Sequence, residues 1–339
     1  MDRAEKLKKW VASQLYNTMV HLEPLTGDAS FRRYFRVHRP DGNLVAVDAP
    51  PEKENNQAFV ALANSLGAQG VQVPSVIAHD FDLGFMLLSD FGDDVFLNKI
   101  NNDNLRYYYQ KAIDALISLH HCVAPSDYQI QKFDASFIRL EIERTEDWYF
   151  SGYLQWQPTI TERTTLNDVY DKIINNAEEQ PLVLVHRDYH SRNLLILPDE
   201  TLGIIDFQDA VWGPITYDLM SLLRDCYITL PSTFIQDKLI SFKKSMISLG
   251  KIDISCSDAT FRRWFDWMGI QRHIKVLGIF SRIYLRDSNS RYLAYIPRVL
   301  DYLVSVSFQY KELKAFNKLL QEVIIFRDNQ LNMNIKNVR

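Results

Sequence analysis

The loop His186–Asn193, together with Asp206 thirteen residues beyond it, constrains the fold of this chain more than any other feature of the sequence. Between Asn193 and Asp206 lie two short runs rich in Ile and Leu, joined by a Pro-Asp-Glu segment that favours a turn. Residues 193–206 are therefore predicted to form a hairpin whose open ends carry an amide oxygen and a carboxylate. Asp188 precedes Asn193 by five residues, on the loop that enters the hairpin.

Two oxygen ligands for a hard cation, with a further carboxylate close by, are the parts of a phosphoryl-transfer site. Protein kinases space their catalytic Asp, their metal-binding Asn and their later metal-binding Asp in the same way. We therefore predict Asp188 as the catalytic residue, and Asn193 and Asp206 as ligands of Mg²⁺. The alternative is a surface hairpin with ordinary polar loop residues, which three residues at fixed offsets make the weaker interpretation.

The composition excludes several other classes of protein. With 339 residues, of which 47% are hydrophobic, the chain can form one large domain or two lobes. Its net charge of −4 gives no support to a nucleic-acid partner, and its three scattered cysteines suggest reduced thiols. Residues 1–10 lack the apolar core of a signal peptide, and no apolar run is long enough to span a bilayer. We expect a cytoplasmic protein without a membrane partner, and a monomer.

The hydrophobic periodicity divides the chain into a β-rich N-terminal lobe over residues 1–90 and a helical C-terminal lobe over residues 91–339. The C-terminal lobe is expected to contain the loop 186–193, the hairpin 193–206 and the helices that bind the acceptor. In the first lobe we expect helices over 3–21 and 54–66, and strands over 31–38, 44–47, 71–77 and 85–88. In the second lobe we expect helices from residue 102, over 136–150 and 165–178 and within 231–325, and a buried strand over 182–185.

Five positions of the first lobe are candidate contacts to a nucleotide. Gly27 and Ser30 lie in a loop of small residues before the first strand, and Arg33 lies near the start of that strand. This arrangement is expected of a segment that covers nucleotide phosphates. The pattern breaks after residue 88, which suggests a hinge where the backbone near Leu88 and Asp90 meets an adenine edge. Asp90-Phe91-Gly92 spells the kinase metal triplet, but it precedes the catalytic loop, so Asp206 is the preferred metal ligand.

One position departs from the kinase pattern. The second strand of the predicted hairpin in protein kinases carries a Lys that binds the phosphates, whereas this chain has Asp48 at the comparable place. An acid does not bind phosphate directly. Either a base from elsewhere supplies the charge or the nucleotide is held differently, and the sequence leaves both possibilities open. The candidate bases are Lys53, Arg32, Arg33 and Arg36.

The motif His186-x-Asp188-x-His190-x-x-Asn193 resembles that of the aminoglycoside phosphotransferase (APH)-like kinases more than that of protein kinases. Longer runs over 27–35, 47–51, 206–210 and 271–280 are similar to one branch of that family, the bacterial anomeric kinases of N-acetylmuramate and N-acetylglucosamine. The resemblance implies an α+β, bilobal protein-kinase-like fold with a small β-rich N-lobe and a large helical C-lobe. It also implies ATP and Mg²⁺ as cofactors, an amino sugar as substrate and its α-1-phosphate as product, for the recycling of cell-wall sugars.

The resemblance also suggests roles for individual residues. Asp188 is the base or orienting carboxylate, Asn193 and Asp206 hold magnesium, and Asp218, His186 and His190 are expected to support the structure. The acceptor is expected to bind the helical half, where aromatic and basic residues gather, although such residues at helical spacing are more often core. The candidates there are Trp148, Trp264, Trp267, Arg272, His273 and Lys275, of which one or two are expected to touch the substrate.

Two other functions remain open at this point. The first is an APH-like kinase of another small hydroxyl acceptor, such as an aminoglycoside or an amino alcohol. A cationic acceptor would need an acidic pocket, so Arg272 and Lys275 favour a neutral or carboxylate-bearing sugar. The second is a nucleotide-binding module without catalysis, which the missing strand Lys suggests. Such a module would bind ATP without sugar-dependent release of ADP.

Overall fold

The computed structural model describes residues 2–16, 19–25 and 31–336, and its chain divides into two compact units. The first unit contains Met1–Gln131 and His186–Val211, and the second contains Lys132–Val185 and Trp212–Arg339. This division differs from the predicted boundary at residue 90, because the catalytic loop and its hairpin belong to the first unit. Backbone hydrogen bonds explain the difference: Ile204 donates to the carbonyl of Gln72, and Ile196 donates to that of Asp94, both at 2.8 Å.

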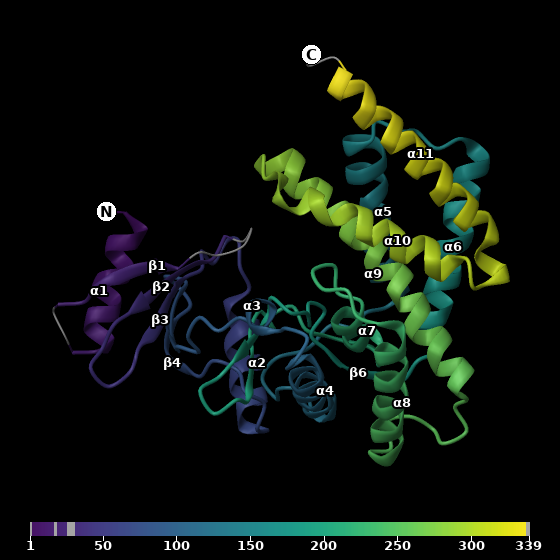
Figure 1. Cartoon of the computed structure of the whole chain (residues 1–339). Helices are drawn as coiled ribbons and strands as arrows, with labels where there is room; N and C mark the ends of the chain where they lie inside the picture. Colours follow the sequence, from purple (N-terminus) through teal and green to yellow (C-terminus); the bar gives the residue numbers. More distant parts are fainter. Residues whose placement is uncertain (1, 17–18, 26–30, 337–339) are drawn as a thin grey trace. The chain divides into compact units, whose positions relative to one another are not determined.

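The first unit is built on an antiparallel sheet with the strand order β1-β2-β3-β5-β4 (Figure 1). The strands are β1 (Leu22–Leu25), β2 (Arg33–Val37), β3 (Leu44–Asp48), β4 (Val76–Asp80) and β5 (Phe85–Ser89). The predicted strand over 71–77 is wrong for most of its length, because β4 begins only at Val76. Pro74 has no N–H to donate to a ladder, which accounts for the late start.

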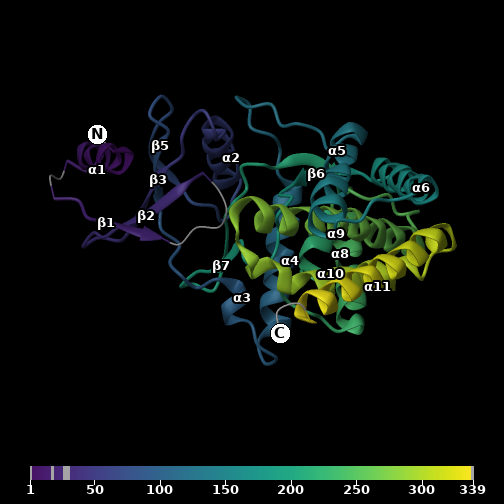
Figure 2. The same ribbon diagram turned by 90° about the horizontal axis from the view of Figure 1, so that it is seen from above.

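Helices flank this sheet, and α1 and α2 lie on opposite sides of it in Figures 1 and 2. The helix predicted over 3–21 is shorter than expected, since α1 ends at Gln14 and Tyr16 adopts a left-handed φ of 49°. The helices of this unit are α1 (Arg3–Gln14), α2 (Asn56–Ala68), α3 (Phe96–Lys99) and α4 (Leu105–His121). The predicted hairpin is confirmed as β7 (Leu194–Ile196) and β8 (Leu202–Ile204), in the register Leu194↔Ile204.

The two faces of the sheet have different neighbours. Side chains alternate between the faces of a strand, so each row of paired residues points to one side. The row Phe35–Ala46–Leu87 faces α1, whose Leu7, Trp10 and Val11 pack with it into a buried cluster. The neighbouring row Tyr34–Val47–Met86 therefore points away from α1.

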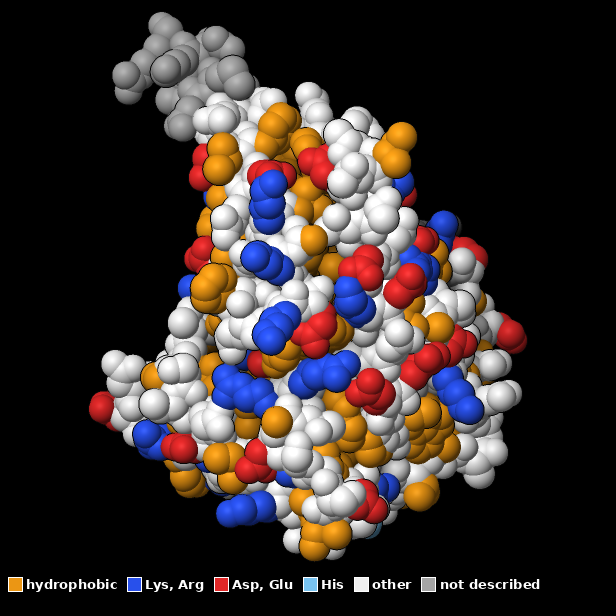
Figure 3. Space-filling model, turned by 90° about the vertical axis from the view of Figure 1, so that its right-hand side faces the viewer, with side chains coloured by type: hydrophobic (Ala, Val, Ile, Leu, Met, Phe, Trp, Pro, Cys, Tyr) orange, Lys and Arg blue, Asp and Glu red, His pale blue; other side chains and the backbone are white. Residues whose placement is uncertain are grey.

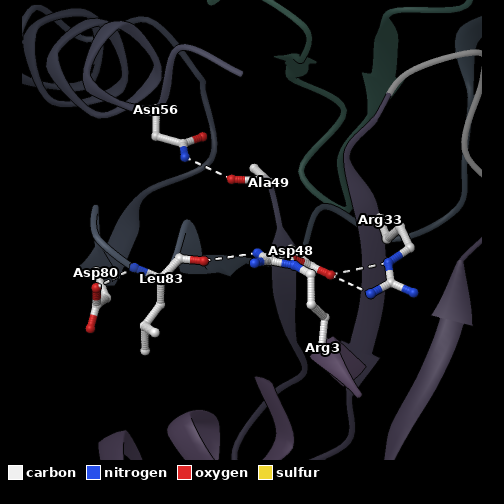
Figure 4. Close-up of polar contacts among 7 residues, drawn as sticks. All are labelled: Arg3, Arg33, Asp48, Ala49, Asn56, Asp80 and Leu83. Atoms are coloured by element: carbon white, nitrogen blue, oxygen red, sulfur yellow. Dashed lines mark hydrogen bonds and ion pairs between the residues drawn. The ribbon is translucent and has the colours of Figure 1, made fainter. Parts of the chain in front are cut away.

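The same alternation directs Asp48 toward α1, where it is fully buried between two arginines (Figure 4). Arg3 of α1 donates from Nε to Oδ1 at 2.9 Å, and Arg33 of β2 donates from Nε to Oδ2 at 3.1 Å. Arg3 also donates to the carbonyl of Leu83 at 2.8 Å. The acid that replaces the expected strand lysine is thus a structural anchor that ties the N-terminal helix to the sheet.

A close backbone approach lies beside this anchor. Ala49 donates from its backbone to the carbonyl of Gly84 at 2.8 Å, and its own carbonyl accepts from the side chain of Asn56 at 2.8 Å. Gly84 has a φ of 69°, and a Cβ there would lie 2.1 Å from the oxygen of Ala49. Only glycine fits this turn, which leads into β5 and so sets its register with β3.

The second unit is mainly helical and is organised around the 30-residue helix α9. This helix contacts α5, α6, α7 and α10 and is buried along most of its length. The predicted helix over 136–150 is divided between α5 and a π-helical turn over 146–153, and the predicted strand over 182–185 is confirmed. The elements are α5 (Ala135–Thr145), π-helix η1 (Glu146–Tyr153), α6 (Ile160–Glu178), β6 (Leu182–Val185), β9 (Val211–Pro214), α7 (Tyr217–Leu223), α8 (Ser232–Ser248), α9 (Asp258–Asp287), α10 (Ile296–Ser307) and α11 (Lys314–Lys336).

The surface of the molecule has no strongly one-sided charge on the face drawn in Figure 3, where acidic and basic side chains are interspersed among the described residues. This mixture is typical of an ordinary solvated surface. Among the residues that the structure describes, no helix has both the length and the apolar character required to cross a membrane.

The anchor at Asp48 generates a prediction about stability. Replacing Asp48 with Ala leaves Arg3 and Arg33 without their shared carboxylate and should lower the free energy of unfolding by about 3 kcal/mol. Urea denaturation followed by circular dichroism measures this change. The matched control is Asp41→Ala, because Asp41 forms an exposed ion pair with Arg39 and should contribute less than about 1 kcal/mol. Equal losses in the two variants would contradict the anchoring role of Asp48.

Candidate active site

The hairpin brings Asn193 and Asp206 together, and the side chain of Asn193 links Asp206 to the catalytic loop. Ile205 donates from its backbone to the carbonyl of Asn193 at 3.1 Å, which closes the open end of the hairpin. The side-chain nitrogen of Asn193 donates to Asp206 Oδ2 at 3.3 Å and to the carbonyl oxygen of Asp188 at 3.0 Å. All three predicted site residues therefore meet within the first unit.

His186 sets the shape of the loop that carries Asp188. Its Nδ1 accepts from the backbone N–H of Asp188 at 3.2 Å, so its Nε2 is the donor to the carbonyl of Ile205 at 2.9 Å. Tyr189 is fully buried and donates from its hydroxyl to the carbonyl of Ala112 at 2.7 Å, which fixes the loop to α4. These contacts hold Asp188 between a strand end and a helix.

Two residues of the site adopt a left-handed backbone conformation. Arg187 has a φ of 74° and Asp206 has a φ of 65°. Non-glycine residues pay of order 1 kcal/mol for this conformation, and they keep it only where the surrounding contacts impose it. Arg187 donates to the carbonyl of Asp209 at 3.2 Å, and Gln208 donates to Asp206 Oδ1 at 2.8 Å. The backbone strain therefore lies at Arg187, which precedes the predicted catalytic Asp188, and at Asp206, a predicted metal ligand.

The surroundings of Asp206 also disfavour the charged form of its carboxyl group. Surrounding protein atoms that displace solvent from it, followed by the nearby Asp188 carboxylate, raise the pKa of Asp206 above its ordinary value. The hydrogen bond from Gln208 and the charge of Arg32 act in the opposite direction but do not cancel the shift. The residue still keeps a solvent-exposed edge, so a cation could approach it from that side. Two acids placed this close favour the binding of a positive ion.

The donor set fits a magnesium ion. Because the nitrogen of Asn193 is engaged by Asp188 and Asp206, the amide oxygen is the atom that this side chain would offer to a cation. Among the described residues, no group of three or more His, Cys, Asp or Glu side chains forms a closed metal site. Magnesium matches such an open site, since it commonly takes one or two carboxylates and completes its shell with phosphate oxygens and water.

The segment after Asp206 is supported by α2. The ring of Phe207 is buried against that of Phe59, with centroids 5.0 Å apart. Glu54 precedes α2 and forms an ion pair of 3.0 Å with Arg32, and the side chains of both are largely buried. Sequence reasoning named Arg32 only as one possible base and missed Glu54. Kinases carry a Glu on the corresponding helix. The position of Glu54 at the start of the helix predicted over 54–66 was therefore the available signal.

The predicted nucleotide contacts are distributed unevenly. Gly27 and Ser30 lie outside the described residues. Arg33 points toward α1 and binds Asp48, on the face of the sheet opposite to that of Tyr34. Leu88 is 3% exposed and is paired with Val45 in the sheet.

Asp90 serves the turn after β5. Arg36 donates to its carboxylate from Nε at 2.6 Å and also binds Asp93, and these hydrogen bonds, that of Asp93 being the larger effect, raise the pKa of Arg36. Asp90 Oδ1 also accepts from the backbone of Gly92 at 2.8 Å. Phe91 packs against Gly203 of the hairpin so closely that a Cβ there would lie 2.4 Å from its ring. The Asp90-Phe91-Gly92 triplet thus shapes a turn, consistent with the preference for Asp206 as the metal ligand.

The predicted acceptor residues Trp267, Arg272, His273 and Lys275 all lie on α9, and each is at most 7% exposed. Lys275 binds the buried Glu141 at 3.0 Å. His273 stacks on Tyr302, and burial lowers its pKa to about 3, so the imidazole is neutral in ordinary buffers. These contacts account for the burial of Lys275 and His273 in the helical core. Direct contact with an acceptor remains a prediction for all four.

The predicted supporting residues are partly buried or buried. His186 is 1% exposed and has the two loop contacts described above, and His190 lies on the same loop. Asp218 is fully buried at the start of α7, in the second unit. Its predicted bond to the catalytic loop remains a prediction.

Comparison with known proteins shows which family this chain resembles. The family model of the phosphotransferase enzymes (APH) matches residues 21–246. The N-acetylmuramate/N-acetylglucosamine kinase of Pseudomonas putida is 38% identical over 302 residues, covering 89% of this chain and 88% of the relative. The kinase of the same name from Pseudomonas aeruginosa is 36% identical over 328 residues, covering 94% of this chain and 96% of the relative.

Solved structures support the same assignment at the level of the fold. The choline kinase LicA from Streptococcus pneumoniae has a TM-score of 0.63 and 15% identity, covering 90% of this chain and 100% of that chain. LicA in complex with AMP has a TM-score of 0.60. The predicted fold class is confirmed: the chain has the α+β, protein-kinase-like fold of these enzymes, with a β-sheet region at its N-terminal side and a helical C-terminal part. From the matching family model, the two relatives and the shared fold together, we conclude that the chain belongs to the phosphotransferase enzyme (APH) family.

Proposed function

We propose that the protein transfers the γ-phosphoryl group of ATP to the C1 hydroxyl of N-acetylmuramate or N-acetylglucosamine and so forms the α-1-phosphate. The observation that carries this proposal is the meeting of Asp188, Asn193 and Asp206 at the end of one hairpin. The names of the Pseudomonas kinases, similar over nearly their whole length, support the choice of acceptor. The same three residues argue against a module that binds nucleotides without catalysis.

Asp188 is the residue proposed to act on the acceptor. The loop holds the backbone of Asp188 through His186 and Asn193. Its carboxylate is proposed to orient the C1 hydroxyl and accept its proton. The hydroxyl oxygen then attacks the γ-phosphorus in line, and the bond to the leaving ADP breaks. A hemiacetal hydroxyl is more acidic than an ordinary alcohol, so a carboxylate suffices as the base.

Asn193 and Asp206 are the residues proposed to hold Mg²⁺. Magnesium bound there would neutralise the charge of the phosphates. Burial first, and then the nearby Asp188 carboxylate, raise the pKa of Asp206, so a cation bound between the two acids would be favourable. Asn193 bonds to both, so it keeps the two acids at a fixed separation while its oxygen serves the ion.

We further propose that the enzyme acts in the cytoplasm as a monomer. A reaction that consumes ATP needs a compartment that supplies it, and the three cysteines, all in the described part of the chain, form no disulfide bond, as expected in a reducing environment. The three proposed site residues come from one copy of the chain, so the site needs no residue from a second copy.

The acceptor is tested by a coupled assay of ADP release. N-acetylmuramate and N-acetylglucosamine should support turnover, whereas aminoglycosides and choline should not. The methyl α-glycoside of N-acetylglucosamine has no free C1 hydroxyl and should be inactive, which makes it the matched control. Phosphorus NMR of the product should show a sugar 1-phosphate. Turnover with choline or an aminoglycoside, but not with the sugars, would reject the proposed acceptor.

The role of Asp188 is tested by Asp188→Asn. The backbone groups that bond His186 and Asn193 remain in this variant, so the loop should keep its shape. Removing the positioned base should lower kcat roughly 10²- to 10⁴-fold. Steady-state kinetics measures this change, and near-normal turnover would remove Asp188 from the mechanism.

The role of Asp206 is tested by Asp206→Asn against Asp209→Asn, an exposed acid three residues further along the chain. The first variant loses a charge that binds magnesium, and magnesium-dependent turnover should be abolished while the thermal unfolding temperature stays close to that of the wild type. The second variant should keep both. Magnesium titration of the activity in each protein measures the difference, and an unchanged magnesium dependence in Asp206→Asn would contradict the assignment.

A further inference from the structure

The structure raises the question of which cation faces the nucleotide phosphates in this enzyme. Kinases place a strand lysine against these phosphates, and its charge contributes to holding them. The acid at the comparable position here, Asp48, is committed to Arg3 and Arg33 on the α1 face of the sheet (Figure 4). A cation on the opposite face, toward Asp206, would have to take over this task.

The register of the sheet identifies the face that is directed toward Asp206. Tyr34 is paired with Val47 and therefore points away from α1. Its pKa is raised to about 12, mainly by burial, and the carboxylates of Asp206 and Glu54 add to this shift. The face of β2 opposite to Asp48 is the side of the sheet on which α2 lies (Figures 1 and 2), and Phe59 of α2 packs against Phe207, the residue after Asp206.

Arg32 is the arginine that shares these surroundings. It binds Glu54 at 3.0 Å, and only 5% of its side chain is exposed, against 13% for that of Glu54. Arg32 and Tyr34 are two residues apart and so lie on the same side of the strand, and the charge of Arg32 counteracts part of the rise in the pKa of Tyr34. Phe59 of α2 packs on Phe207, which connects the helix that follows Glu54 to the residue that follows Asp206.

The other candidate cations are engaged elsewhere. Arg33 binds Asp48 on the α1 face. Arg36 binds Asp90 and Asp93 after β5. The ammonium of Lys53 lies 5.5 Å from the ring centroid of Phe31. Among these cations, Arg32 is the one paired with an acid that leads into α2, the helix that packs against the residue after Asp206.

We propose that Arg32, held in place by Glu54, binds the β-phosphate of the nucleotide and replaces the strand lysine of protein kinases. A guanidinium carries five N–H donors in a planar fork, enough to hold a carboxylate and a phosphate together. Glu54 is then a positioning residue, as the helix Glu is for the lysine of kinases. The inference rests on the proposed use of ATP, but it does not depend on which acceptor is phosphorylated.

The test compares the binding of ADP and AMP by isothermal titration calorimetry in the presence of magnesium and without any sugar. AMP lacks the β-phosphate that Arg32 is proposed to bind. In Arg32→Gln the dissociation constant for ADP should rise roughly 10- to 100-fold, the effect of losing a charged hydrogen bond, while that for AMP changes less than about 2-fold. Unchanged ADP affinity in this variant would overturn the proposal.

Two further variants separate this effect from general damage. Arg39→Gln removes an exposed arginine that binds Asp41 and should leave both affinities unchanged. The double variant Arg32→Gln/Glu54→Gln avoids a buried unpaired acid, so it protects the fold while still lacking the phosphate cation. It should show the same selective loss of ADP, with circular dichroism and thermal unfolding close to the wild type. Equal losses of ADP and AMP affinity in the double variant would reject the proposal.

Arg33→Gln tests the competing assignment. Our inference expects normal ADP affinity in this variant, and a selective loss of ADP there, with none in the Arg32 variants, would transfer the role to Arg33. A failure of the proposed function gives a different result. In that case the wild type would bind ADP and show the Arg32 effect, yet it would not release ADP when the amino sugars are added.

Discussion

The amide group of Asn193 is the contact on which the organisation of the site depends. Its nitrogen joins the carboxylate of Asp206 to the carbonyl of Asp188, so one side chain couples the end of the hairpin to the catalytic loop. A two-stranded hairpin is marginal by itself. Here it is fixed by backbone bonds to the segments around Gln72 and Asp94. Asp188 and Asp206 are thereby held close together despite the repulsion between their carboxylates, and this arrangement favours the binding of a cation.

The sheet then distributes positive charge between its two sides. Arg33 begins β2 and Arg32 precedes it, and the side chains of neighbouring residues point to opposite sides of a strand. Arg33 therefore binds Asp48, whereas Arg32 binds Glu54. Each largely buried guanidinium or carboxylate has an opposite charge, as burial of ions requires. One pair stabilises the attachment of α1, and the other joins the start of β2 to the segment that leads into α2. A single alternating strand can therefore serve stability on one side and the proposed nucleotide binding on the other.

How much the sequence predicts depends on the distance over which each feature is determined. The hairpin and its three polar residues follow from local spacing and turn chemistry, and the structure brings them together as expected. The family and the fold class were also recognised correctly. The late start of β4 follows from Pro74, a local signal that the sequence contains. In contrast, the partner of Asp48 depends on strand register and on a helix 45 residues away, which no local pattern contains. Basic and aromatic residues on α9 do not reveal in advance whether they line a pocket or fill a core.

The order of the segments also has a consequence for biosynthesis. The chain passes from one compact unit to the other after residues 131, 185 and 211, so each unit is assembled from two separate stretches. A ribosome releases the sheet and α4 early, but the hairpin that completes this unit emerges only after residues 132–185 have left the exit tunnel. Domains usually fold in the order of their synthesis. In this protein the first unit can be completed only after residues 132–185 of the second unit have been made. A nascent chain cut before residue 206 would lack the acid that is proposed to bind magnesium.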